Sequence, residues 1–170
     1  MKVVDVLLKG TVDSRAAASA LLKDPGDTAL IYRGRLRWLV MICPCGCGDQ
    51  LPINLDPAAG PAWVAHQYGD KLSVYPSVWR DVGCESHFIV WRDEVLLFER
   101  YGDWLGTLPD GYDLANVRSA LTTDAYTHFA DVATALGAIP WDVLLACREL
   151  VKRGEVVEGG GDARATFRRI

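Results

Sequence analysis

Two short stretches carry the residues best suited to chemistry in this chain. The first is Cys43-Pro44-Cys45-Gly46-Cys47-Gly48, and the second is Cys84-Glu85-Ser86-His87. Thiolate sulfur and imidazole nitrogen are the ligands that zinc prefers, and a structural zinc site takes four of them in a tetrahedron. The two stretches therefore predict one zinc site with five candidate ligands: Cys43, Cys45, Cys47, Cys84 and His87.

Five candidates compete for four places, because the first stretch is Cys-x-Cys-x-Cys where the common zinc pattern has one Cys-x2-Cys pair. The ligand set that the spacing favours is Cys47, Cys84 and His87, with either Cys45 or Cys43 as the fourth. The alternative to a zinc site is that these cysteines are buried free thiols of the core, where cysteine is common. Three cysteines within five residues argue against it, and the absence of a secretory-like start argues against disulfides.

Length and composition set the broad class of the protein. The chain has 170 residues, which is enough for one ordinary domain or two small ones, and half of it is hydrophobic. Its net charge of −4 does not demand a nucleic-acid partner, and no apolar run is long enough to span a bilayer. We expect a cytoplasmic protein with no membrane partner.

The stretches flanking the cysteines have the pattern of β-strands. Residues 36–42 and 50–55 surround the first stretch, so it would lie at the tip of a hairpin, in a zinc-knuckle or treble-clef-like arrangement. Residues 87–91 follow the second stretch, and residues 76–83 are expected to be a loop. Together with a short helix over residues 16–22, these strands predict a small, mostly antiparallel sheet within a zinc-stapled domain of residues 1–100.

The pattern changes after a segment rich in Gly, Asp and Pro at residues 101–112, which we interpret as a linker. Helices are expected over residues 113–121, from about Thr127 to Gly137, and from Pro140 to Gly154. A hairpin turned at three glycines, 159–161, would follow. Residues 113–170 therefore predict a winged helix-turn-helix, and the whole chain belongs to the α+β class.

These motifs resemble an uncharacterised bacterial family of zinc-binding domains. The likeness rests on the hexapeptide Cys43–Gly48, on Tyr75-Pro76-Ser77 and on Cys84-x-Ser86-His87-Phe88, and it covers residues 25–100. Some members of that family are encoded beside bacterial ubiquitin-like conjugation genes. The resemblance implies a compact zinc module in such a system, and it carries no settled activity.

Three functions compete on this basis. The first is a zinc-containing interaction or adaptor protein whose partner is another protein. The second is a DNA-binding regulator, which is not favoured because residues 115–170 hold seven basic and seven acidic residues and lack a basic footprint. The third is a hydrolase linked to a ubiquitin-like system, with Glu85 or Asp49 as base beside an open zinc, or with a spare cysteine as nucleophile.

Overall fold

The computed structural model describes residues 3–97 and 107–170. The chain divides into two compact units, Met1–Trp104 and Leu105–Ile170. Part of the expected linker, residues 101–106, lies outside the described residues.

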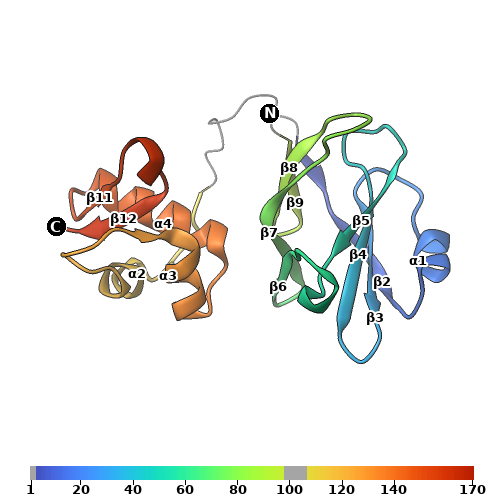
Figure 1. The fold of residues 1–170 in the computed structure, drawn as a ribbon, viewed down its shortest axis with the longest axis horizontal. Helices are drawn as coiled ribbons and strands as arrows, with labels where there is room; N and C mark the ends of the chain where they lie inside the picture. Colours follow the sequence, from blue (N-terminus) through green and yellow to red (C-terminus); the bar gives the residue numbers. More distant parts are fainter. Residues whose placement is uncertain (1–2, 98–106) are drawn as a thin grey trace. The chain divides into compact units, whose positions relative to one another are not determined.

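The described residues of the first unit form two β-sheets and the helix α1 (Figure 1). Where the sequence pattern indicated a single small sheet, a four-stranded sheet has the order β2-β3-β4-β5 and a five-stranded sheet has the order β1-β9-β8-β7-β6. All strand pairs in this unit are antiparallel except β2 with β3. The elements are β1 (Val3–Asp5), β2 (Leu7–Val12), α1 (Arg15–Leu21), β3 (Asp27–Tyr32), β4 (Leu36–Ile42), β5 (Gln50–Asn54), the 3-10 turn η1 (Pro57–Ala59), β6 (Val64–Tyr68), β7 (Lys71–Trp79), β8 (His87–Trp91) and β9 (Glu94–Leu97).

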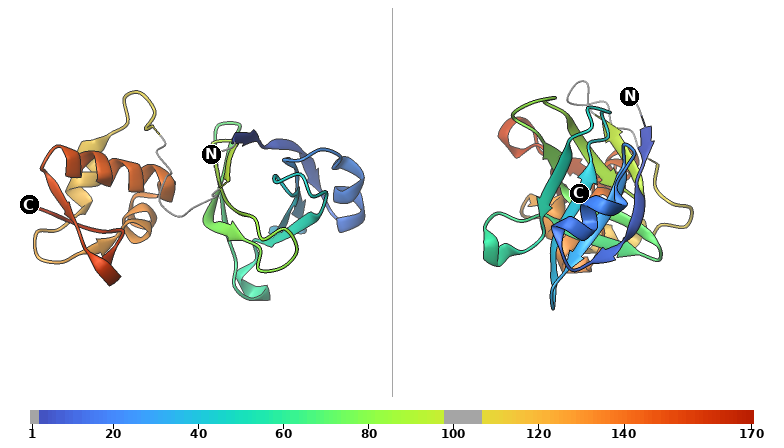
Figure 2. Two further views of the ribbon diagram at one scale, coloured as in Figure 1. Left: turned by 90° about the horizontal axis from the view of Figure 1, so that it is seen from above. Right: turned by 90° about the vertical axis from the view of Figure 1, so that its right-hand side faces the viewer.

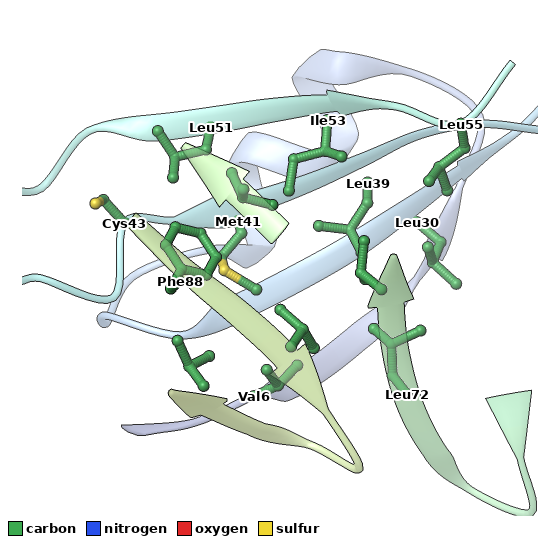
Figure 3. Packing of buried hydrophobic residues seen from close by; sticks show 14 residues of the cluster. Val6, Leu30, Leu39, Met41, Cys43, Leu51, Ile53, Leu55, Leu72 and Phe88 are labelled. Atoms are coloured by element: carbon green, nitrogen blue, oxygen red, sulfur yellow. The ribbon is translucent and has the colours of Figure 1, made fainter. Parts of the chain in front are cut away.

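The second half of strand β4, residues 39–42, is buried on both faces, and this explains its continuous apolar run. Leu39 and Met41 pack into a core shared with the five-stranded sheet (Figure 3), while Val40 and Ile42 pack beneath α1. Successive side chains of a strand point to opposite faces, so a run without alternation fits a strand covered on both sides. Figure 2 shows α1 on the side of the four-stranded sheet that faces away from β7–β9.

The expected loop over residues 76–83 needs correction, because β7 continues to Trp79. A register shift between Val74 and Val78 interrupts the pairing of β7 with β8. Pairing then resumes with Val78 opposite Phe88 and Trp79 opposite His87. Proline cannot donate a ladder hydrogen bond, so Pro76 suggested that the strand had ended; the irregularity around it lets the strand go on.

The second unit combines three helices with a small antiparallel sheet of order β10-β12-β11. Asp113 caps the first of these helices, and His128, not Thr127, caps the second, which ends at Gly137 in the left-handed conformation. The elements are α2 (Leu114–Ala120), β10 (Thr127–His128), α3 (Phe129–Leu136), α4 (Pro140–Lys152), β11 (Val156–Glu158), the 3-10 turn η2 (Gly161–Ala163) and β12 (Thr166–Arg169).

Among the described residues, no single helix has the length and apolar character needed to cross a bilayer. Helices α3 and α4 reach that length and composition only as a pair, and they are bent by 116° where they meet.

Asp27 at the start of β3 is a buried carboxylate that ties down the chain before it. Its Oδ2 accepts hydrogen bonds from the backbone N–H groups of Lys23 and Asp24 at 2.9 and 3.1 Å, and Lys9 Nζ lies 3.1 Å from Oδ1. Burial by itself would raise the pKa of Asp27, but these partners lower it below the ordinary value of 3.8.

We expect Asp27→Asn to lower the free energy of unfolding by about 1–3 kcal/mol at pH 7, because an amide replaces a charged acceptor. The lowered pKa of Asp27 means that its contribution is present above the unfolded pKa and is lost as pH falls through the folded value. Urea unfolding between pH 7 and pH 2 measures both effects. The exposed Asp70→Asn serves as the control, and equal stability of the two variants would contradict this role.

Candidate metal cluster and the serine–histidine pair beside it

Four cysteines gather at one point of the first unit. The sulfur atoms of Cys43, Cys45, Cys47 and Cys84 all lie within 4.8 Å of one another. Cys43 Sγ is 3.3 Å from that of Cys45 and 3.6 Å from that of Cys84. The first three follow β4, and Cys84 lies in the β7–β8 connection. The cluster therefore joins residues from both sheets.

The β4–β5 hairpin presents its three cysteines through a tight, hydrogen-bonded turn. The N–H of Cys43 donates to the carbonyl of Asp49 at 2.8 Å, and the N–H of Gly46 donates to the carbonyl of Cys43 at 3.1 Å. Gly46 has a φ of 90°, which glycine adopts without strain. Figure 3 shows Cys43 at the end of the core, after Leu39 and Met41. The turn is thus fixed to the buried end of β4.

Two polar side chains surround the sulfur atoms. Ser86 Oγ lies 3.3 Å from the sulfurs of both Cys43 and Cys84. Arg80 Nη1 is 3.3 Å from Cys84 Sγ and 2.7 Å from Asp49 Oδ2. The hydrogen bond between the Ser86 hydroxyl and Cys84 Sγ lowers the pKa of Cys84 to about 6, whereas burial raises the pKa of Cys45 to about 12. Without a metal ion, Cys84 is therefore the cysteine of the cluster that favours the thiolate form. Ionisation of all four cysteines requires a bound cation to balance their negative charges.

The donor set fits a tetrahedral metal ion. With Zn–S bonds of about 2.3 Å, the sulfur atoms of a tetrahedral site lie about 3.8 Å apart, and the observed 3.3 and 3.6 Å are close to this. Four thiolates would fill all four positions, which is the pattern of a closed structural zinc site. The four cysteines can thus hold one metal ion, and zinc is the ion that this chemistry fits.

The fifth candidate ligand, His87, has a different partner. Its Nε2 lies 3.0 Å from Ser77 Oγ, and His87 is not a member of the four-residue group. Strand pairing explains this contact. Trp79 is opposite His87, and Ser77 is two residues before Trp79 on the same face of β7. The core-facing Val78 and Phe88 are buried, so Ser77 and His87 lie on the other face of the sheet.

The environment of the pair suits proton transfer. Burial lowers the pKa of His87 below its ordinary value of 6.5, so the imidazole is neutral at pH 7. The indole N–H of Trp63 donates to the backbone carbonyl of Ser77 at 3.2 Å, and the ring of Trp79 is 6.4 Å from that of His87. A neutral imidazole bonded to a hydroxyl is the arrangement in which histidine activates a serine nucleophile.

Sequence reasoning did not single out Ser77 as a site residue. The signal was the strand alternation that places Ser77 near His87, and it was hidden because residues 76–83 were interpreted as a loop. The proposed bases are otherwise engaged or exposed: Asp49 pairs with Arg80, and Glu85 is an exposed residue with a φ of 50°.

Fold and site together define a two-sheet β unit with a four-cysteine cluster beside a serine–histidine pair. Residues 16–98 match the family described as bacterial ubiquitination-like system serine protease (BubE). This range contains all four clustered cysteines as well as Ser77 and His87. The match links the chain to a bacterial ubiquitination-like system, in line with the family resemblance. Comparison with curated proteins and with solved structures gave no match.

If the cluster is a closed metal site, we expect one zinc ion per chain in the purified protein. Cys84→Ala should reduce zinc to near zero and lower the melting temperature, because Cys84 is the ligand that brings in the second sheet. Cys147→Ala is the matched control, since Cys147 is a buried free thiol of α4 outside the cluster. Elemental analysis and thermal unfolding measure both. Stoichiometric zinc in Cys84→Ala would contradict the closed site.

Proposed function

We propose that this chain is a serine protease of a bacterial ubiquitination-like system, with Ser77 as nucleophile and His87 as general base. The observation that carries the proposal is the 3.0 Å contact between Ser77 Oγ and His87 Nε2. Both residues lie within the segment that matches a family described as serine proteases of such systems. The substrate class would be proteins joined to a ubiquitin-like modifier.

The proposed chemistry follows from the pair. His87 takes the proton of Ser77 as Oγ attacks the substrate carbonyl, which gives a tetrahedral intermediate. The imidazolium gives that proton to the leaving amine as the C–N bond breaks, and an acyl-enzyme remains. Water, deprotonated by the same imidazole, then attacks the acyl group, and the imidazolium returns the proton to Ser77 Oγ as the acid leaves. The lowered pKa of His87 keeps its nitrogen available as a proton acceptor at neutral pH.

In this proposal the cysteine cluster positions the catalytic pair. Zinc bound there would supply folding free energy and no open coordination position. Ser86 contacts two of the cysteine sulfurs and immediately precedes His87. Holding Ser86 inward therefore fixes the residue that begins β8 and orients the histidine on the opposite face.

We further propose that residues 113–170 form a winged helix that contacts protein. The helix order and the β10-β12-β11 pairing support this. Nine of the thirteen residues of α4 are buried. The exposed Lys152 at its end and Arg153 just after it each lie within 4 Å of a Glu149 carboxylate oxygen. Cations that are already paired with a carboxylate offer little net positive charge to DNA phosphates. We therefore favour docking to a protein, in the cytoplasm.

We expect Ser77→Ala and His87→Ala each to lower kcat for cleavage of a ubiquitin-like conjugate by about 10³-fold or more, because nucleophile and base act as one unit. Ser119→Ala, a serine of α2 in the other unit, should keep the wild-type rate. The measurement is the release of free modifier by gel or mass spectrometry. A fluorophosphonate probe should label Ser77 and should fail to label Ser77→Ala.

The same rate should fall as pH drops through the pKa of His87, because protonation removes the base. Since burial places that pKa below 6.5, the midpoint of the fall should lie below pH 6.5. Full cleavage by Ser77→Ala, or a rate independent of His87, would overturn the proposal.

A further inference from the structure

A second feature of the first unit, outside the elements that carry Ser77 and His87, is a cavity of about 710 Å³. It lies around the β3–β4 hairpin, the start of α1 and the turn η1. This volume is in the range of small-molecule sites. Its charged and aromatic lining residues are Arg15, Arg33, Arg35, Arg37, Trp38 and Asp56.

The lining is strongly positive, although the chain as a whole has a net charge of −4. Four arginines face one aspartate in the lining. The Asp56 side chain is only 4% exposed, whereas those of Arg35 and Arg37 are 57% and 37% exposed. The carboxylate is therefore buried behind the guanidinium groups, which keep access to solvent.

The arginines are held in place before any ligand binds. Asp56 pairs with Arg35 at 3.0 Å and also with Arg37. The guanidinium of Arg15 lies 5.2 Å from the ring centre of Trp38, and Arg33 Nε donates to the carbonyl of Asp13 at 2.6 Å. Each of these contacts leaves other N–H donors on the guanidinium. Fixed arginines lose less conformational freedom when they bind an anion.

We propose that this cavity binds a small phosphate-bearing molecule, an assignment that goes beyond the proposed protease function. A guanidinium group can donate two parallel hydrogen bonds to two oxygens of one phosphate. Several fixed arginines therefore favour a ligand with more than one negative charge. The cavity is bounded by Trp38 and the small side chains of Ala58 and Ala59, so a phosphate ester of nucleotide size fits as well as a free pyrophosphate.

Other anionic partners fit the observations less well. Nucleic acid usually meets a basic patch or stripe on a basic domain, whereas here the chain is acidic and the arginines surround one cavity. An acidic protein surface would need a broad, flat basic face, and the described cavity is a concave site of limited volume.

The test is isothermal titration of the full chain with pyrophosphate and with ATP at moderate salt, and with a polyglutamate peptide as an anion that carries no phosphate. Arg15→Gln and Arg33→Gln are the variants to use, because changes at Arg35 or Arg37 would strip partners from the buried Asp56. Arg164→Gln, an exposed arginine of the second unit, is the control for the loss of one charge.

We expect pyrophosphate or ATP to bind and each cavity variant to weaken binding about tenfold, the cost of one charged hydrogen bond. Arg164→Gln should bind like the wild type. Tighter binding of ATP than of pyrophosphate would indicate a nucleotide, and equal binding the phosphate groups alone. Binding that is equally strong in the cavity variants, no binding of either phosphate compound, or equal binding of a polyglutamate peptide would overturn the proposal.

Discussion

The first unit depends on the convergence of four sulfur atoms at one end of its core. Cys43, Cys45 and Cys47 follow a strand of the four-stranded sheet, and Cys84 follows a strand of the five-stranded sheet. The two sheets pack against each other through their inner faces. A cluster that joins the two sheets at the edge of their shared core fixes their spacing where apolar burial alone ends, and a bound metal ion would add its free energy at that point.

Strand alternation turns this structural anchor into the geometry of the proposed active site. Ser86 points toward the sulfurs, His87 toward Ser77, and Phe88 back into the core. Three consecutive residues thus have three separate partners. A shift of β8 by one residue would exchange the two faces, so the contacts of Ser86 and Phe88 both hold His87 on the outer face. The cysteine cluster thus helps to fix the position of His87 in the Ser77–His87 pair.

The sequence was informative where the pattern is local and poor where pairing is distant. Strand 36–42, the cysteine hairpin and the short helix α1 could be predicted because the residues that signal each element lie within a few positions of one another. The division of the strands between two sheets could not, since β1 pairs with β9 across roughly ninety residues. The Cys-x-x-His spacing suggested His87 as a ligand, but spacing alone does not reveal that neighbouring residues on a strand face opposite ways.

Arginine has two distinct uses in this acidic chain, and exposure separates them. The side chain of Arg80 is 19% exposed and contacts Asp49 and the sulfur of Cys84. Its positive charge therefore interacts with groups of the fold itself. The hydrogen bond to Asp49, together with the contact with Cys84, raises the pKa of Arg80 above its ordinary value, although burial alone would lower it. Arg35 and Arg37 also have a carboxylate partner, but Asp56 is one buried group between two more exposed guanidinium ions. One negative charge cannot satisfy ten N–H donors, and this excess distinguishes an anion-binding lining from a structural ion pair.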